Sequence, residues 1–214
     1  MSKDSNMTGI PNIQPYLMPT PSELPKNIAP WKIDAKRVVL LVHDMQQYFV
    51  RQIPHDNPRE ALIKNISLIR NRCEKLNIPV AFTAQNGGMT ESERGLLKYF
   101  WGDGMKVDQD DRRIIEELTP SKNNWLFSKW RYSAFYRSDL LRRMRETQRN
   151  QLIICGVYAH IGVLCTAIES FSHDIQTFLV PDAIAAFSKA HHHMALNYAA
   201  QCCSVNVFSH EILV

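Results

Sequence analysis

The run QLIICGVYAHIGV at residues 151–163 decides the fold. Its apolar first half predicts a buried strand, and Gly156 then opens a tight turn that leads into a helix expected from Val163 to His173. Backbone N–H groups at such a helix start can bind an anion or a carbonyl oxygen, and the small Gly162 leaves them open. The nearest thiol, Cys165, lies three residues after Gly162, so no cysteine stands at this helix start.

On both sides of this unit, apolar runs that predict strands alternate with segments of helical periodicity. The expected strands are 37–43, 79–84, 125–127, 152–155, 177–180 and 205–208, and the expected helices are 59–76, 91–100, 110–118, 139–147, 163–173 and 190–202. This alternation predicts an α/β fold. We expect a doubly wound, mostly parallel six-stranded sheet with helices on both faces, which is a Rossmann-like three-layer sandwich.

The chain of 214 residues is long enough for one domain with a substantial core. Residues 1–34 are expected to form a polar start at residues 1–6 and then a proline-rich extended arm, because dense prolines disfavour regular structure. Residues 35–214 are expected to form the single domain.

Bulk composition indicates an ordinary globular protein, with 45% hydrophobic and 21% charged residues. The net charge of +4 is too small to indicate a nucleic-acid partner. The five cysteines show no metal-binding spacing and leave one unpaired, which favours reduced thiols and a cytoplasmic location. The sequence shows no signal peptide and no apolar segment of membrane-spanning length, so no membrane partner is expected.

Four polar side chains directly follow predicted strands: Asp44, Gln85, Lys129 and Tyr158. The carboxyl ends of parallel strands meet at one edge of a sheet, where such folds bind ligands. Taken singly, Asp44 could be a turn or capping residue, and Lys129 could be a surface lysine. Together, an acid, a base and an amide at one edge predict a polar cluster over the core.

Three consecutive histidines at residues 191–193 suggest a metal site only at first sight. Neighbouring residues of a helix point about 100° apart, so three in a row cannot converge on one ion. The sequence also lacks a P-loop and a glycine-rich dinucleotide motif, and it has 8 glycines in all. We therefore expect neither a metal nor a cofactor.

Several runs, spread over nearly the whole chain, are shared with one known family. They are HDMQ at 43–46, YF at 48–49, TAQ at 83–85, FWG at 100–102, KWRYSAF at 129–135, GVYAHIG at 156–162 and DAIA at 182–185. These runs resemble the isochorismatase family of hydrolases. RGLLK at 94–98 and MALNYAA at 194–200 are similar to its branch in phenazine biosynthesis.

The resemblance implies a reaction: hydrolysis of the enolpyruvyl group, a vinyl ether, of 2-amino-2-deoxyisochorismate to trans-2,3-dihydro-3-hydroxyanthranilate and pyruvate. In this family an acid delivers a proton to the terminal methylene carbon, water adds, and no covalent intermediate forms. The substrate is a small dianion, and the resemblance favours a homodimer.

The resemblance also implies roles for seven residues of this chain. Asp44 matches the general acid, Lys129 matches the lysine beside it, and the backbone at Gly162 lies against the substrate. The matches to substrate-contacting positions are Gln85, Arg94, Trp101 and Tyr158. One tension follows, since Lys129 should lower the pKa of Asp44, whereas burial and the carboxylates of the substrate should raise it. We therefore expect Asp44 to become an effective acid mainly in the complex.

Three other functions stay open. The first is isochorismatase proper, which makes 2,3-dihydro-2,3-dihydroxybenzoate for a catechol siderophore. Many such enzymes continue into an aryl carrier domain, whereas this sequence ends at Val214, which favours the phenazine role. The second is a thiol amidohydrolase, whose cysteine would stand where this chain has Gly162. The third is a non-catalytic binding protein, against which the presence of both Asp44 and Lys129 argues.

Overall fold

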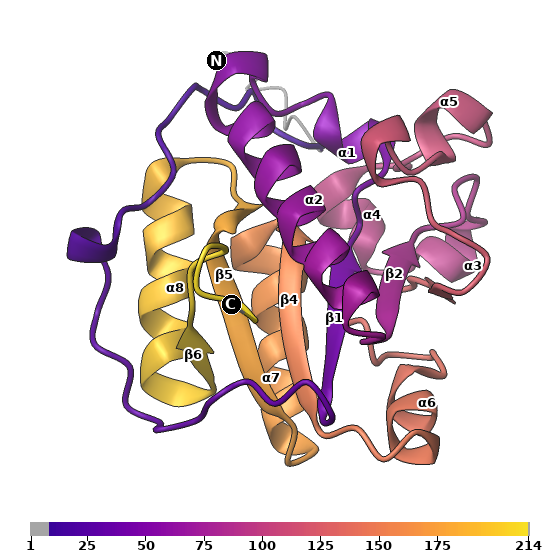
Figure 1. Ribbon diagram of the computed structural model, residues 1–214. Coiled ribbons are helices and arrows are strands. Elements are labelled where there is room, and N and C mark those ends of the chain that lie inside the picture. Colours follow the sequence, from indigo (N-terminus) through magenta and orange to yellow (C-terminus); the bar gives the residue numbers. More distant parts are fainter. Residues whose placement is uncertain (1–8, 214) are drawn as a thin grey trace.

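The computed structural model describes residues 9–213, in which a six-stranded sheet lies between two layers of helices (Figure 1). The strands are β1 (Val38–His43), β2 (Val80–Ala84), β3 (Trp125–Ser128), β4 (Gln151–Val157), β5 (Gln176–Ala185) and β6 (Ser204–Asn206). Their order across the sheet is β3-β2-β1-β4-β5-β6, and each neighbouring pair is parallel. The predicted α/β class is confirmed, and the sheet that was expected to be mostly parallel is parallel throughout the described residues.

Helices and helical turns make up the rest of the regular structure. The helices are α1 (Gln47–Val50), α2 (Glu60–Lys75), α3 (Glu91–Arg94), α4 (Leu97–Trp101), α5 (Gln109–Arg112), α6 (Leu140–Glu146), α7 (Leu164–Ser172) and α8 (Lys189–Cys202). The turns are η1 (Pro21–Glu23), η2 (His55–Arg59), η3 (Glu116–Leu118) and η4 (Ala159–Val163). None of the helices in this part of the chain is long and apolar enough to cross a membrane.

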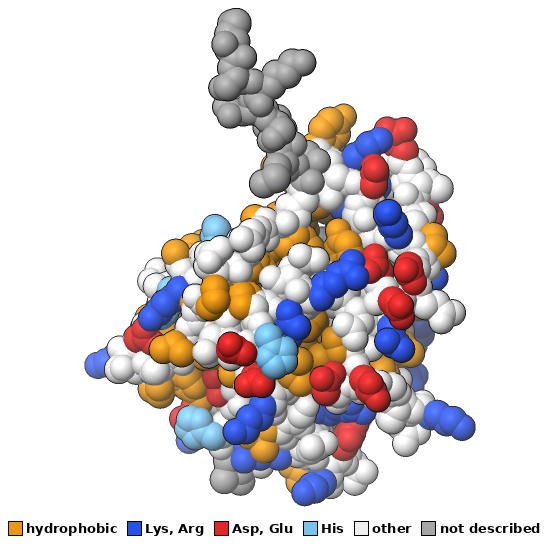
Figure 2. Space-filling model, turned by 90° about the horizontal axis from the view of Figure 1, so that it is seen from above, with side chains coloured by type: hydrophobic (Ala, Val, Ile, Leu, Met, Phe, Trp, Pro, Cys, Tyr) orange, Lys and Arg blue, Asp and Glu red, His pale blue; other side chains and the backbone are white. Residues whose placement is uncertain are grey.

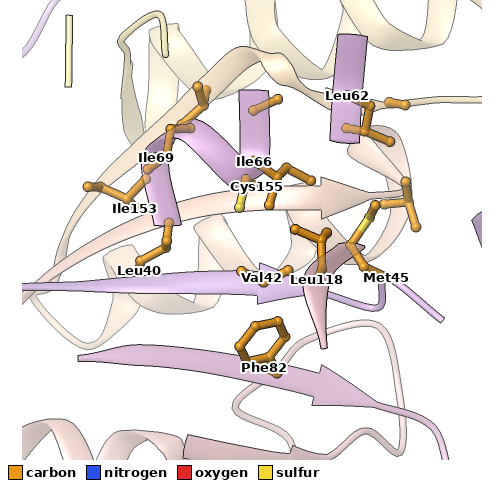
Figure 3. Close-up of a cluster of buried hydrophobic side chains, with 14 of the residues drawn as sticks. Leu40, Val42, Met45, Leu62, Ile66, Ile69, Phe82, Leu118, Ile153 and Cys155 are labelled. Carbon is orange, nitrogen blue, oxygen red and sulfur yellow. The ribbon is translucent and has the colours of Figure 1, made fainter. Parts of the chain in front are cut away.

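The central strands of the sheet are buried on both faces, as β1 shows, since all six of its residues are inaccessible. The edge strand β3 is partly exposed. Leu40 and Val42 point to the face that α2 covers, where they join one hydrophobic cluster with Ile66 and Ile69 (Figure 3). Val39 and Leu41 point to the opposite face and join a second cluster. That cluster includes Leu140 of α6, Ala167 of α7 and Leu196 of α8. Burial on both faces explains why the strand sequences are continuous apolar runs.

The order of the strands reverses between β1 and β4, which lie side by side at the centre of the sheet. The chain moves outward from β1 to β2 and β3, then returns to β4 on the other side and continues to β5 and β6. Connections that diverge in this way leave a crevice beyond the carboxyl ends of the central strands, where α/β proteins bind ligands.

The segment from residue 10 to residue 34 runs in extended form past α8 and β6 and then back to the start of β1 (Figure 1). Several contacts fasten it, including those of Tyr16 and Asn27. The Tyr16 hydroxyl accepts a hydrogen bond from the backbone N–H of Ala186 at 2.8 Å, and the side-chain amide of Asn27 bonds the backbone of Asn206 at 2.8 and 2.9 Å. The predicted polar start at residues 1–6 lies outside the described residues, and the boundary between arm and domain stays a prediction.

Two predicted helices are wrong as continuous elements. The helix expected over 91–100 is broken at Gly95, whose φ of +50° ends α3 before α4 begins. A side chain at Gly95 would also meet the Arg131 guanidinium at 2.9 Å. The helix expected over 110–118 is split into α5 and η3, because Ile114 pairs with Gln46 in an isolated β-bridge.

Candidate active site

Strands β1 and β3 each deliver one charged side chain to the same point. Asp44 follows the last residue of β1, and Lys129 follows the last residue of β3. The Lys129 Nζ donates a hydrogen bond to the Asp44 Oδ2 at 3.0 Å. Asp44 is 5% exposed and Lys129 is 2% exposed, so the two charges form a buried ion pair. Strand β2 lies between the two strands and supplies Thr83, whose hydroxyl donates to the Asp44 Oδ1 at 2.6 Å.

Opposing effects act on the pKa of Asp44. Burial raises this pKa, but the charge of Lys129 lowers it, as do His43 and the hydrogen bonds from Thr83 and Lys129, and the net shift is downward. Burial, and then Lys129, lowers the pKa of the adjacent His43 to about 4, so His43 is neutral near pH 7. Of the groups that lower the pKa of Asp44, Lys129 has the largest effect. Because the net shift is downward, Asp44 is ionised in the free protein at neutral pH.

One cavity brings together all seven residues that the resemblance singled out. It is lined by Asp44, Gln85, Arg94, Trp101, Lys129, Tyr158 and Gly162. Among its described lining residues, Arg94, Lys129 and Arg131 are cationic and Asp44 is the one carboxylate, which leaves an excess of two positive charges. On the face of the molecule at the carboxyl ends of the strands, hydrophobic side chains lie exposed between charged ones (Figure 2). The charge of the cavity suits a small dianion with an apolar body.

Hydrogen bonds hold the aromatic and arginine side chains of the cavity wall in place. The Arg94 Nε donates to the carbonyl of Gly102 at 2.9 Å, and the Trp101 Nε1 donates to the Tyr132 hydroxyl at 2.8 Å. The Tyr158 hydroxyl donates to a backbone carbonyl, that of Phe49, at 2.8 Å. Burial raises the pKa of Tyr158, so this side chain stays neutral. Tyr158 therefore presents its ring to the cavity, while its hydroxyl proton is engaged elsewhere.

Gly162 lies against the imidazole of His43. A Cβ atom at position 162 would stand 2.4 Å from the His43 Cε1 and 3.1 Å from the carbonyl oxygen of Tyr132. The imidazole is itself fixed, since its Nδ1 lies 2.7 Å from the carbonyl oxygen of Val157. The sequence suggested that a small residue leaves the turn open. The structure adds a steric reason, because the ring of His43 occupies the space that a side chain at position 162 would need.

None of the described residues that line the cavity is a cysteine. Burial raises the pKa of the Cys165 thiol, which disfavours the reactive thiolate. All five cysteines are free. The histidine run separates as its helical positions require, since His191 stacks on His160 at 4.4 Å while the His192 Nδ1 faces the Tyr16 hydroxyl at 3.2 Å. Residues 9–213 contain no group of three or more side chains placed to hold a metal ion.

Sequence reasoning missed several residues that build or touch the site, among them Thr83, His43, Arg131 and Ile10. Thr83, His43 and Arg131 all lie within shared sequence runs, but a run does not say which of its members faces the cavity. His43 carried one further signal, since it is a polar residue at the end of a buried strand. Ile10 also lines the cavity, and nothing in a proline-rich arm pointed to that contact.

The fold, and the acid–lysine pair at the carboxyl ends of its strands, are those of an α/β enzyme that acts on a small molecule. The family model of the isochorismatase domain matches residues 38–211, and the chain belongs to the isochorismatase family. It is 53% identical to the phenazine biosynthesis protein PhzD1 of Pseudomonas aeruginosa, over 97% of this chain and 100% of that protein. It is 48% identical to an isochorismatase of Bacillus subtilis, over 95% of this chain and 66% of that protein.

Solved structures of low sequence identity share the fold. A cysteine hydrolase from Pseudomonas syringae has a TM-score of 0.78 at 19% identity, and the match covers 88% of this chain and 95% of the other. At this identity the likeness shows the fold alone. The family that was predicted from the shared runs is confirmed, and so is its similarity to the phenazine branch.

Proposed function

We propose that this protein hydrolyses the enolpyruvyl ether of 2-amino-2-deoxyisochorismate and releases pyruvate and trans-2,3-dihydro-3-hydroxyanthranilate. The observation that carries the proposal is the buried pair of Asp44 and Lys129 on the wall of a positively charged cavity. Identity of 53% over the full length of a phenazine biosynthesis protein supports this choice of substrate.

In the proposed reaction, Asp44 gives its proton to the terminal methylene carbon of the vinyl ether. The electrons of the double bond form the new C–H bond, and the ether oxygen stabilises the resulting oxocarbenium ion. Water adds to the ether-bearing carbon of this ion, not to the methyl group just formed, and loses a proton, which restores the protonated acid. The hemiketal then collapses to pyruvate and the ring alcohol. Each step is completed by proton transfer, so the mechanism needs no nucleophilic side chain.

Binding of the substrate raises the pKa of Asp44 and so favours its protonated form. The free carboxylate is ionised because Lys129 lowers its pKa. A dianionic substrate in the same cavity offsets that positive charge and favours the neutral acid. Arg94 serves to attract the carboxylates of the substrate, while Gln85, Trp101, Tyr158 and the backbone of Gly162 serve to contact it. Arg131 joins this set because it lines the same cavity.

Isochorismatase activity is the second candidate, favoured by 48% identity to the Bacillus subtilis isochorismatase. The two substrates differ at one ring substituent, and the reacting group is the same in both. The deciding experiment measures kcat/KM of pyruvate release for both compounds under one set of conditions. We expect turnover of both and a preference for the amino compound, with modest discrimination unless a buried polar partner reads the substituent. A large preference for isochorismate would reverse the ranking, and no pyruvate from either compound would overturn both candidates.

The homodimer and the cytoplasmic location remain predictions. Light scattering on the purified protein measures the first, and fractionation of the producing cells measures the second.

A further inference from the structure

Thr83 holds Asp44 at two points. Its hydroxyl accepts a hydrogen bond from the backbone N–H of Asp44 at 3.1 Å and donates one to the Asp44 Oδ1 at 2.6 Å. Thr83 is 1% exposed, so water does not compete for this hydroxyl. The hydroxyl has one proton, and the short contact to Oδ1 assigns that proton to the carboxylate.

The two bonds act on a residue with an unusual backbone. Asp44 has a φ of +50°, in the left-handed region that few residues with a side chain adopt. A bond to its N–H fixes where the chain turns after β1, and a bond to Oδ1 fixes the rotation of the carboxylate. Both originate from one atom, so the backbone turn and the direction of the acid are set together.

Lys129, the other close partner of the Asp44 carboxylate, fixes its orientation less rigidly. Lys129 reaches the Asp44 Oδ2 through a long side chain, whereas Thr83 is β-branched and stiff at χ1. Thr83 also sits within the sheet, since its Cα is paired in register with His43 of β1 and with Phe127 of β3. Of these two contacts, the threonine is the one whose position the sheet fixes directly.

We propose that Thr83 is a positioning residue, which aims the Asp44 carboxylate into the cavity and holds it ready to deliver a proton. The inference rests on the proposed role of Asp44 as the acid. In this view the sheet, through Thr83, orients the Asp44 carboxylate, which Lys129 alone does not do.

Removal of the hydroxyl has a consequence with a definite sign. The bond from Thr83 lowers the pKa of Asp44, so its loss should raise that pKa. The nearest charged or titratable neighbours of Asp44 are Lys129 at 3.0 Å and His43 at 3.7 Å. The others that line the cavity are Tyr48, Arg94, Arg131, Tyr132 and Tyr158. A substitution at position 83 alone leaves the chemical identity of all these groups unchanged.

The test compares Thr83→Val, which keeps the shape and removes the hydroxyl, with Thr83→Ser, which keeps the hydroxyl. Thr177→Val is the matched control, because Thr177 is equally buried on β5 and its hydroxyl bonds Ser170 instead. The first readout is a carbon-13 NMR titration of the Asp44 carboxyl in the free, folded protein. It needs no substrate. The second is the pH profile of kcat for pyruvate release from isochorismate.

In Thr83→Val we expect the Asp44 titration to move up by about one pH unit or more, because a hydrogen bond to a charged group is lost. The limb of the kcat profile that falls with rising pH should move in the same direction, and kcat should fall about tenfold or more. Thr83→Ser should restore both readouts, and Thr177→Val should change neither.

An unchanged Asp44 titration in folded Thr83→Val, or failure of Thr83→Ser to restore it, would overturn the inference. Thr83→Ala replaces the valine variant if that one does not fold. A failure of the proposed function looks different. In that case the wild-type protein releases no pyruvate, while the NMR titration still reports on the contact between Thr83 and Asp44.

Discussion

Two properties of Asp44 limit which residues can replace it: its left-handed backbone and its carboxylate. Its φ of +50° is tolerated by aspartate and asparagine better than by most residues, since their short polar side chains bond locally. Asp44→Asn should therefore keep the fold and still bind the dianion, because it also removes a negative charge. Loss of the acid should slow turnover by about 10²–10⁴-fold or more. Single-turnover pyruvate release checks the rate, and calorimetry checks binding. A rate within tenfold of wild type would remove Asp44 from the mechanism.

The lowered pKa of Asp44 leads to a prediction about protons. The free carboxylate is ionised at neutral pH, and an anionic ligand in the cavity raises its pKa, so binding should take up a proton. The ligand to use is a saturated ether analogue of the substrate, which binds without reacting. Calorimetry in two buffers of different ionisation enthalpy measures the uptake, which should approach one proton as the pKa passes the working pH. The same titration of Asp44→Asn should show none, and equal uptake in both proteins would assign the proton to another group.

Gly162 and His43 should be energetically coupled. Gly162→Ala places a Cβ 2.4 Å from the His43 Cε1, so we expect a loss of about 1–3 kcal/mol in the free energy of unfolding, together with reduced turnover. His43→Ala removes the obstructing ring. The double variant should therefore be more stable than the sum of the two single effects predicts, which a double-mutant cycle measures by urea unfolding. Additive losses would show that the backbone moves aside at no cost.

At the scale of elements, the arm depends on Tyr16. Its buried hydroxyl is the partner of the Ala186 N–H and faces the His192 Nδ1. Tyr16→Phe removes this hydroxyl and leaves the Ala186 N–H and the His192 Nδ1 without that hydrogen-bond partner. The free energy of unfolding should therefore fall by about 1–3 kcal/mol. Tyr99→Phe removes the same atom from a side chain that is 77% exposed, and it should change little. Equal unfolding midpoints for the two variants would contradict the view that this contact fastens the arm.

The elements that could be predicted from the sequence are those with strong periodicity. The strands formed by Val38–His43 and Gln151–Val157 are buried on both faces, so their apolar runs leave no other interpretation. The break at Gly95 and the bridge at Ile114 could not be predicted in the same way. Gly95 turns beside the guanidinium of Arg131, and Ile114 pairs with Gln46, and both partners are distant in the sequence. Local patterns indicate helices, but long-range contacts decide where they stop.

At the scale of the whole molecule, the site could be placed because topology needs only the order of strands. Asp44 and Lys129 are 85 residues apart, yet each follows a strand, so a parallel sheet brings them to one edge. The cavity lining from Ile10 could not be found this way, since no strand delivers it. The close approach of Gly162 to His43 could not be found either, because it depends on the distance between a turn and a neighbouring strand.

The five free cysteines allow a test on the intact protein. No thiol lines the cavity within the described residues, so alkylation should leave most of the activity intact. Cys202 is exposed and should react first with iodoacetamide. Mass spectrometry locates the label while pyruvate release is followed. Inactivation that substrate prevents, with the label on Cys165, would revive the thiol mechanism.

The contact between Gly162 and His43 also bears on how this chemistry could have changed during evolution. A cysteine at position 162 costs stability while the imidazole remains, because its first side-chain atom would stand 2.4 Å from the ring. Gain of the ring beside a thiol at that position carries the same cost. The less costly order of substitution is therefore to reduce residue 43 first. The intermediate on that route is a protein with glycine at position 162 and a residue smaller than histidine at position 43.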